Sequence, residues 1–233
     1  METKRLTLFA GHYGSGKTNI ALNFARILRQ QTEAVTIADL DIVNPYFRTK
    51  DSEAALAAEG IRLIVSEYAN SNVDLPAMPK EIYGLVDDRS TYGVLDIGGD
   101  DRGALALGRY VPAILEENNY EMLAVINKAR PLTRTVEDTL AVLAEIEGAC
   151  QLPFTGIVNN TNFGLQTTAE DVLGSLNYAE EVSRASGLPI KYTCADERIC
   201  PELEGKVPNL FPLKLQKLYY MINTEVQNGK SNI

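Results

Sequence analysis

The residues best suited to chemistry form one glycine-rich run near the N-terminus, Gly11-His-Tyr-Gly-Ser-Gly-Lys-Thr18, with the spacing G-x-x-x-x-G-K-T. Gly14 and Gly16 let the backbone curl so that its N–H groups point at phosphate oxygens. Lys17 can neutralise the β- and γ-phosphates, and the hydroxyl of Thr18 can bind Mg²⁺. We therefore expect the whole run to contact a nucleotide: Gly11, His12, Tyr13, Gly14, Ser15, Gly16, Lys17 and Thr18.

Carboxylates follow two further apolar segments. Asp96 ends the segment 94–96 and suits a metal-binding role through water, and the backbone N–H of Gly99 could meet the γ-phosphate. Asp39 and Asp41 end a second segment, at the sheet edge where α/β proteins bind ligands. We expect Asp39 and Asp96 to join Thr18 as the metal site, and Asp41 to orient the attacking water.

Short apolar runs alternate with amphipathic segments along the chain. The runs are continuously apolar, which is typical of strands buried on both faces: 6–10, 34–38, 61–65, 93–97, 123–126, 155–158 and 189–193. Helices are predicted over 18–29 and 133–146 and from a capping box at Thr168 to Gly187. A last helix, opened by Pro212, is predicted from Leu213 to about Val226. The alternation predicts an α/β three-layer sandwich with a mostly parallel central sheet of about seven strands. Together with the loop motif Gly11–Thr18, this architecture resembles the fold of P-loop NTPases.

No linker, repeat or low-complexity tract divides the sequence, so we expect a single nucleotide-binding domain over 1–233 with a frayed tail at 227–233. The net charge of −9 argues against a nucleic-acid partner. No apolar stretch is long enough for a membrane span and no signal peptide is recognisable, so we expect a cytoplasmic protein without a membrane partner. With His12 as the single histidine, imidazole-rich metal sites and Ser-His-Asp triads are hard to build.

In the order of these motifs the sequence resembles the ParA/MinD and nitrogenase-iron-protein-like branch of P-loop ATPases over roughly residues 5–200. The order is the loop, then Asp39-Leu-Asp41, then Asp96-Ile-Gly-Gly99, then Gly156-Ile-Val-Asn-Asn160. The resemblance implies ATP and Mg²⁺ as cofactors, hydrolysis with Asp41 activating water, and Asn160 in contact with adenine. It also implies a protein partner and the possibility of a homodimer.

The sequence departs from this family at two places. The family carries a lysine directly after the first glycine of the loop, which reaches across an ATP-bound dimer, whereas this chain has His12. Imidazole is a poorer phosphate partner, so ATP-driven dimerisation of that kind is not implied; His12 could cap the loop or respond to pH. The cluster cysteine of the iron protein is replaced by Gly103, although Cys194 and Cys200 leave open a shared metal site in a dimer.

The identity of the base follows from a missing carboxylate. Guanine-specific relatives end a strand with N/T-K-x-D, and here Asn127-Lys-Ala-Arg130 places an arginine where that aspartate is needed. ATP is therefore favoured over GTP.

The leading hypothesis is a Mg²⁺-dependent ATPase that acts as a nucleotide switch on a partner protein, in metalloenzyme maturation or regulation, with slow turnover in the absence of the partner. An ATP-dependent synthetase or kinase of the dethiobiotin or cobyrinate type is the alternative, in which Arg48 and Lys50 would grip a substrate carboxylate. A nucleotide-dependent scaffold with negligible hydrolysis is a third possibility.

Overall fold

A computed structural model describes residues 3–40, 50–65, 80–98 and 107–215 of the 233-residue chain. Within these residues, eight strands form one sheet in the order β3-β2-β4-β1-β5-β6-β7-β8, and all neighbouring pairs are parallel. The strands are β1 (Leu6–Ala10), β2 (Val35–Leu40), β3 (Ile61–Val65), β4 (Tyr92–Ile97), β5 (Tyr120–Ile126), β6 (Gly156–Asn159), β7 (Ile190–Asp196) and β8 (Leu210–Leu213). The predicted α/β class and parallel sheet are confirmed, with one strand more than the seven expected.

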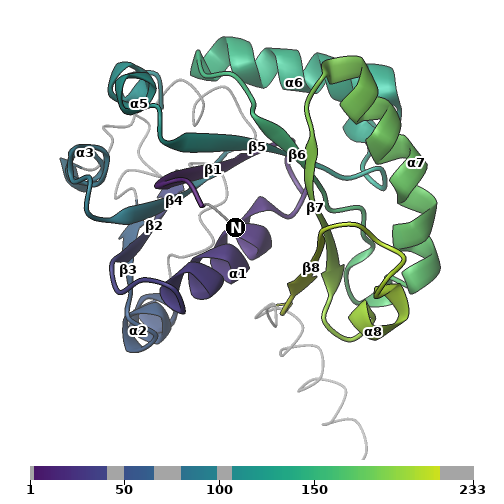
Figure 1. Ribbon diagram of the computed structural model, residues 1–233, viewed down its shortest axis with the longest axis horizontal. Coiled ribbons are helices and arrows are strands. Elements are labelled where there is room, and N and C mark those ends of the chain that lie inside the picture. The colour runs from purple at the N-terminus through teal and green to yellow at the C-terminus, as the bar shows by residue number, and fades with distance from the viewer. Residues whose placement is uncertain (1–2, 41–49, 66–79, 99–106, 216–233) are drawn as a thin grey trace, which may run out of the picture.

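Helices cover both faces of this sheet (Figure 1). The helices are α1 (Lys17–Arg29), α2 (Lys50–Ala58), α3 (Lys80–Asp87), α5 (Val111–Glu117), α6 (Val136–Cys150), α7 (Ala169–Ser186) and α8 (Cys200–Leu203), with 3₁₀ turns η1 (Pro131–Thr133) and η2 (Gly164–Gln166). Side chains of α1 and α2 share one apolar cluster, and those of α3, α5, α6 and α7 share the cluster on the opposite face. Removing these clusters from water is the main force that holds the three layers together.

Strand β1 lies in the middle of the sheet, hydrogen-bonded to β4 on one side and to β5 on the other. All five of its residues are buried, as the continuously apolar run predicts for a strand covered on both faces. The loop that follows β1 is therefore surrounded by the carboxyl ends of β2, β4, β5 and β6.

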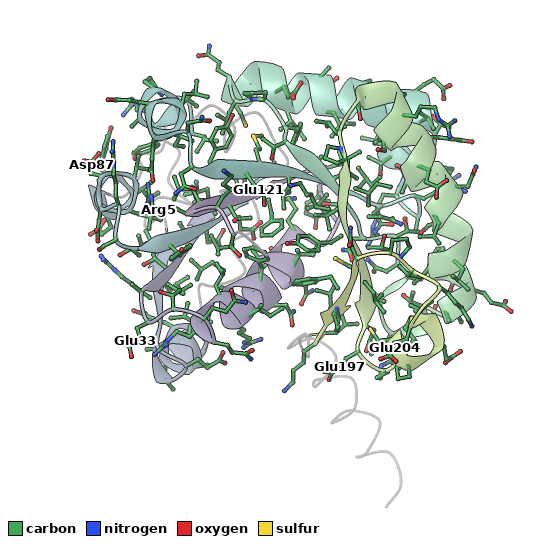
Figure 2. All side chains as sticks on the ribbon, viewed as in Figure 1. Arg5, Glu33, Asp87, Glu121, Glu197 and Glu204 are labelled. Atoms are coloured by element: carbon green, nitrogen blue, oxygen red, sulfur yellow. The ribbon has the colours of Figure 1, made fainter. Side chains whose placement is uncertain are left out.

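A buried arginine fixes the amino end of this central strand. Arg5 is 3% exposed; it donates to the carbonyl oxygens of Leu85 at 2.9 Å and Val86 at 3.0 Å on α3, and it forms an ion pair with Glu117 on α5. Figure 2 shows Arg5 on the inner side of α3. Since its donors are matched by acceptors, the buried charge is compensated and ties two helices to the strand that leads into the loop.

The end of the described chain differs from the prediction. Pro212 does not open a helix but lies in the edge strand β8, in which Phe211 and Leu213 are buried and Pro212 is exposed. This alternation of buried and exposed residues is typical of a strand, and an edge strand tolerates proline because one side of it needs no hydrogen bonds. The rest of the predicted helix and the tail at 227–233 lie outside the described residues.

Two predicted helix signals are confirmed. Thr168 accepts from the backbone N–H of Asp171 at 3.2 Å while Asp171 accepts from that of Thr168 at 2.9 Å, and Gly187 closes α7 with a φ of 75°. The helix predicted over 133–146 starts later, at Val136 with Thr135 as its N-cap, because Pro131 opens a separate 3₁₀ turn.

Candidate phosphate-binding site

The predicted phosphate loop connects the carboxyl end of β1 to the first turn of α1. Gly14 has a φ of 75° and Gly16 a φ of 92°, in the left-handed region that favours glycine. Gly11 makes a close approach instead, since a Cβ there would lie 2.4 Å from the carbonyl oxygen of Val125 on β5. The three glycines therefore permit the curved path of the loop between two strands and a helix.

Lys17 lies inside this curve. The residue is 5% exposed, and its ammonium nitrogen lies 3.4 Å from the carbonyl oxygen of His12, which also accepts the backbone N–H of Ser15 at 3.1 Å. The first N–H groups of an α-helix have no partner within the helix. A buried ammonium group and these N–H groups together suit a phosphate, which carries several anionic oxygens.

Ser15 and His12 occupy different surroundings in the loop. The hydroxyl of Ser15 is fully buried and has no hydrogen-bond partner among the residues that the structure describes. The His12 ring is half-buried with its Nδ1 3.0 Å from the carbonyl oxygen of Tyr13, whose own side chain is 60% exposed. His12 and Tyr13 therefore form the outer side of the loop.

Asn160, predicted to contact adenine, lies against the backbone of the loop. Its Nδ2 donates to the carbonyl oxygen of Ser15 at 2.7 Å, and the residue is 3% exposed. A Cβ on Gly16 would lie 2.3 Å from this nitrogen, so the amide fills the space that a side chain at Gly16 would need. This support of the loop by the end of β6 is a contact that the sequence analysis did not predict.

The two predicted metal carboxylates that the structure describes are neighbours. Asp39 on β2 and Asp96 on β4 are paired in register, so their side chains point to the same face, and they are 2% and 1% exposed. The hydroxyl of Thr18 donates to Oδ2 of Asp96 at 2.6 Å. Two buried carboxylates and a hydroxyl are oxygen ligands of the kind that Mg²⁺ prefers, so the residues present fit this ion.

Several predicted residues cannot be placed. Asp41 and Gly99 lie outside the described residues, as do residues 42–49, which include Arg48. Lys50 begins α2, but its side chain is not described. The water-activating and γ-phosphate roles of Asp41 and Gly99 therefore remain predictions.

Beside the loop, the structure brings in a residue to which sequence reasoning gave no role. Arg130, which follows β5, donates from Nε to the carbonyl oxygen of Gly14 at 2.8 Å. The sequence singled out this position only for the carboxylate that it lacks. Nothing in the local pattern indicated that an arginine 116 positions away would contact the loop.

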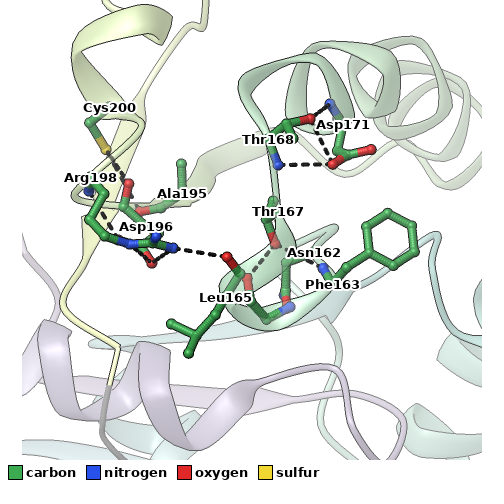
Figure 3. A network of polar contacts seen from close by, with 11 residues as sticks. Asn162, Phe163, Leu165, Thr167, Thr168, Asp171, Ala195, Asp196, Arg198 and Cys200 are labelled. Carbon is green, nitrogen blue, oxygen red and sulfur yellow. Dashed lines mark hydrogen bonds and ion pairs between the residues drawn. The ribbon is translucent and has the colours of Figure 1, made fainter.

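A polar network joins the loops that follow β6 and β7 (Figure 3). Arg198 donates to Asp196 at 2.6 Å and to the carbonyl oxygen of Leu165 at 3.3 Å, while Thr167 accepts the N–H of Phe163 at 2.9 Å. Burial opposes ionisation of Asp196, but the hydrogen bonds from Arg198 outweigh it and lower the pKa of this carboxyl. The network thus connects the loop after β6 to the loop after β7, although Phe163 and Leu165 are more than half exposed.

The three cysteines do not belong to any cluster of metal-ligating side chains in the described residues. Cys150, Cys194 and Cys200 are buried free thiols, and Sγ of Cys200 lies 3.4 Å from the carbonyl oxygen of Asp196. Burial raises the pKa of all three thiols. Within the described ranges, no three His, Cys, Asp or Glu residues come together as a metal-binding group.

Comparison with known proteins gives matches only at the level of structure. No family model and no curated protein matches the sequence. Chloroplast FtsY from Physcomitrella patens is 17% identical with a TM-score of 0.55, over 83% of this chain and 59% of that one. Cell division protein FtsY from Thermotoga maritima is 18% identical with a TM-score of 0.54, over 84% and 64%. The signal recognition particle 54 kDa protein from Aeropyrum pernix K1, solved in complex with GDP, is 17% identical with a TM-score of 0.51, over 82% and 41%.

This chain spans less than two thirds of the length of each of these three structures. At such low identity the comparisons show the fold, and the fold agrees with the loop motif and the parallel sheet. No helix in the described part of the chain has the length and apolarity to cross a membrane. The chain therefore has the fold of the P-loop NTPases.

Proposed function

We propose that this protein is a Mg²⁺-dependent ATPase that acts as a nucleotide switch on a partner protein, in the manner of the ParA/MinD-like class. The observation that carries the proposal is the hydrogen bond from Thr18 to Asp96, next to a buried Lys17 inside the loop. In P-loop NTPases the metal lies between a loop hydroxyl and a strand-end carboxylate, and the loop lysine binds the β- and γ-phosphates. The hydrogen bond and the burial of Lys17 support these roles for the three side chains.

Each residue has a defined part in the proposed reaction. Lys17 and the N–H groups at the start of α1 bind the phosphates and stabilise the charge that develops on them. Thr18, Asp39 and Asp96 would hold Mg²⁺, which supplies charge neutralisation when bound. Asp41 would orient water for in-line attack on the γ-phosphate, and Gly99 would donate its N–H to that phosphate.

The choice of ATP over GTP rests on Arg130. A carboxylate at this position could accept from the N1 and N2 hydrogens of guanine, whereas a guanidinium has only donors. Because the matching signal recognition particle structure was solved in complex with GDP, both nucleotides belong in the test.

A protein partner is favoured by exposed apolar side chains in the loops that follow the carboxyl ends of three neighbouring strands. Tyr13, Leu132, Phe163 and Leu165 are each more than half exposed and lie in the loops after β1, β5 and β6. Large apolar side chains that remain exposed can serve as contacts for a partner protein. A partner that docks on these loops would sense the phosphates through the loop between β1 and α1.

Titration calorimetry tests the nucleotide site. The wild type is titrated with ATP and with GTP in Mg²⁺, and ATP is expected to bind more tightly. Lys17→Ala should abolish the heat of binding, while Lys206→Ala, which changes an exposed lysine after α8, should leave it unchanged. Unchanged ATP affinity in Lys17→Ala would refute the site, and tighter binding of GTP would refute the choice of base.

Release of phosphate tests the reaction class. The switch proposal expects slow hydrolysis of ATP by water alone. Hydrolysis that occurs only when a small carboxylic acid is added would instead support the synthetase or kinase alternative. Tight binding with no turnover would support the scaffold.

A further inference from the structure

Two carbonyl oxygens of the phosphate loop accept hydrogen bonds from side chains that follow two other strands. Arg130 donates from Nε to the carbonyl oxygen of Gly14 at 2.8 Å, and Asn160 donates to that of Ser15 at 2.7 Å. Two consecutive peptide groups of the loop are thus fixed. Arg130, which follows β5, fixes the peptide between Gly14 and Ser15, and Asn160, which follows β6, fixes the peptide between Ser15 and Gly16.

The local structure of the β5–α6 connection fixes the backbone of Arg130. Its N–H donates to the carbonyl oxygen of Asn127 at 3.0 Å, which closes a tight turn, and Pro131 then starts η1. Arg130 has an extended backbone, with φ −98° and ψ 141°, which is the conformation that a following proline favours. The side chain therefore starts from a defined point next to the loop.

The base of this turn is anchored in the core. The hydroxyl of Thr133 donates to the carbonyl oxygen of Asn127 at 2.7 Å, and the hydroxyl of Tyr178 on α7 donates to the carbonyl oxygen of Thr133 at 2.7 Å; both contacts are buried. Arg130 itself is exposed, so its contact with Gly14 is the outermost link of a chain that begins in the core.

These contacts orient the loop through the geometry of the peptide group. In a trans peptide the carbonyl and the N–H point in opposite directions. When Arg130 holds the Gly14 carbonyl outward, the Ser15 N–H points back at the carbonyl oxygen of His12, where it is observed at 3.1 Å. When Asn160 holds the Ser15 carbonyl, the N–H of Gly16 points in the opposite direction, away from Asn160.

We infer that Arg130 is a positioning residue of the phosphate loop: it fixes the peptide between Gly14 and Ser15 and thereby prepares the loop for phosphate. The inference rests on the proposed nucleotide site and adds a residue to it. Among the three side-chain nitrogens of Arg130, only Nε makes a hydrogen bond to a residue that the structure describes, and its partner is the loop. The effect should therefore fall on the binding of phosphates and be independent of the base.

Two variants separate the hydrogen bond from the charge. Arg130→Gln keeps an N–H donor the same number of bonds from Cα as Nε, but it removes the charge; Arg130→Met removes both. Each is titrated by calorimetry with Mg²⁺–ATP and with Mg²⁺–tripolyphosphate, which has no base. Arg134→Ala, which removes an exposed arginine four residues away, is the matched control.

We expect Arg130→Met to weaken both ligands by the same factor, about three- to tenfold, the effect of losing one net hydrogen bond. The affinities of Arg130→Gln and Arg134→Ala for both ligands should stay within about twofold of the wild-type affinities. Because Arg130 is exposed, the midpoint of thermal unfolding should not change in any variant.

Four results would overturn the inference. Loss of ATP affinity with unchanged tripolyphosphate affinity would make Arg130 a base contact, and equal losses in Arg130→Gln and Arg130→Met would mean that the charge is what matters. Equal losses in Arg134→Ala would point to a non-specific effect of charge. Wild-type affinity of Arg130→Met for both ligands would mean that Arg130 has no role in phosphate binding. A wild-type protein that binds neither ligand would refute the proposed nucleotide site itself.

Discussion

The hydroxyl of Thr18 lies 2.6 Å from a carboxylate oxygen of Asp96, although 78 positions separate the two residues in the chain. Thr18 is in the first turn of α1 and Asp96 is near the end of β4, and the pairing of β1 with β4 brings them together. Asp39 is the register partner of Asp96 on the next strand. The sheet thus places three oxygen-bearing side chains beside the phosphate loop.

The first prediction concerns the metal. Asp96→Asn keeps the shape of the side chain and its hydrogen bond with Thr18, but it removes the negative charge that attracts Mg²⁺. We expect the Mg²⁺ affinity of the ATP complex to fall at least about tenfold, whereas ATP affinity measured in EDTA should change little. Titration of Mg²⁺ at fixed ATP, followed by calorimetry, measures the effect. An unchanged Mg²⁺ affinity would remove Asp96 from the metal site.

The second prediction concerns the left-handed turn of the loop. Gly16→Ala puts a Cβ at a φ of 92° and 2.3 Å from Nδ2 of Asn160. We expect a loss of about 1–3 kcal/mol in the free energy of unfolding, together with loss of nucleotide binding. Adding Asn160→Ala should relieve the contact but not the backbone strain, so recovery should be partial.

A second glycine provides the control for that experiment. Gly148 lies in α6, and a Cβ there would meet no atom within 4 Å. Gly148→Ala should stabilise the protein by about 0.5–1 kcal/mol because it lowers the entropy of the unfolded chain. Urea unfolding measures both variants, and equal behaviour of the two would show that the shape of the loop at Gly16 imposes no constraint.

The third prediction concerns pH and the pair Arg5–Glu117. The hydrogen bond from Arg5 lowers the pKa of Glu117 below its ordinary value of 4.5. Because the folded-state pKa is the lower one, the pair stabilises the fold fully above about pH 4.5, and this contribution is lost as the pH falls through the folded-state pKa.

Glu117→Gln tests this contribution. At pH 7 the variant should lose about 2 kcal/mol of unfolding free energy, since a buried guanidinium keeps its carbonyl partners but loses its carboxylate. The difference from the wild type should shrink as the pH is lowered below 4.5. Glu204→Gln, at an exposed position, is the control. A difference that does not vary with pH would contradict the assigned titration.

The fourth prediction concerns His12 and rests on the proposed function: the resemblance to ParA/MinD-like proteins aligns this residue with the lysine that reaches across their dimer. A lysine carries a full positive charge on a flexible stem, so His12→Lys should strengthen ATP-dependent self-association, by about tenfold in dimer affinity. Analytical ultracentrifugation with Mg²⁺–ATP compares the two proteins. Identical sedimentation at all concentrations would mean that this position makes no contact across a dimer.

The sequence by itself determined strands β1 to β7, helices α1, α6 and α7, the parallel sheet and the position of the loop motif, but it did not predict helices α2, α3 and α5. These features rest on local signals: continuous apolar runs for strands buried on both faces, glycines at the left-handed positions, and the capping box at Thr168. Such signals can be read from a short stretch of sequence because they depend on nearby residues in the chain and not on residues that are distant in sequence. The edge strand β8 was missed because Pro212 followed by apolar residues also matches the start of a helix.

Only the tertiary structure decided which side chains from distant parts of the chain meet at the loop. The contacts of Asn160 with Ser15 and of Arg130 with Gly14 span 145 and 116 positions. They depend on the order in which the strands lie side by side, with β5 next to β1 and β6 next to β5. The spacing of residues along the chain does not reveal this strand order. The sequence analysis therefore noted Arg130 only for the carboxylate missing at its position and did not predict its contact with the loop.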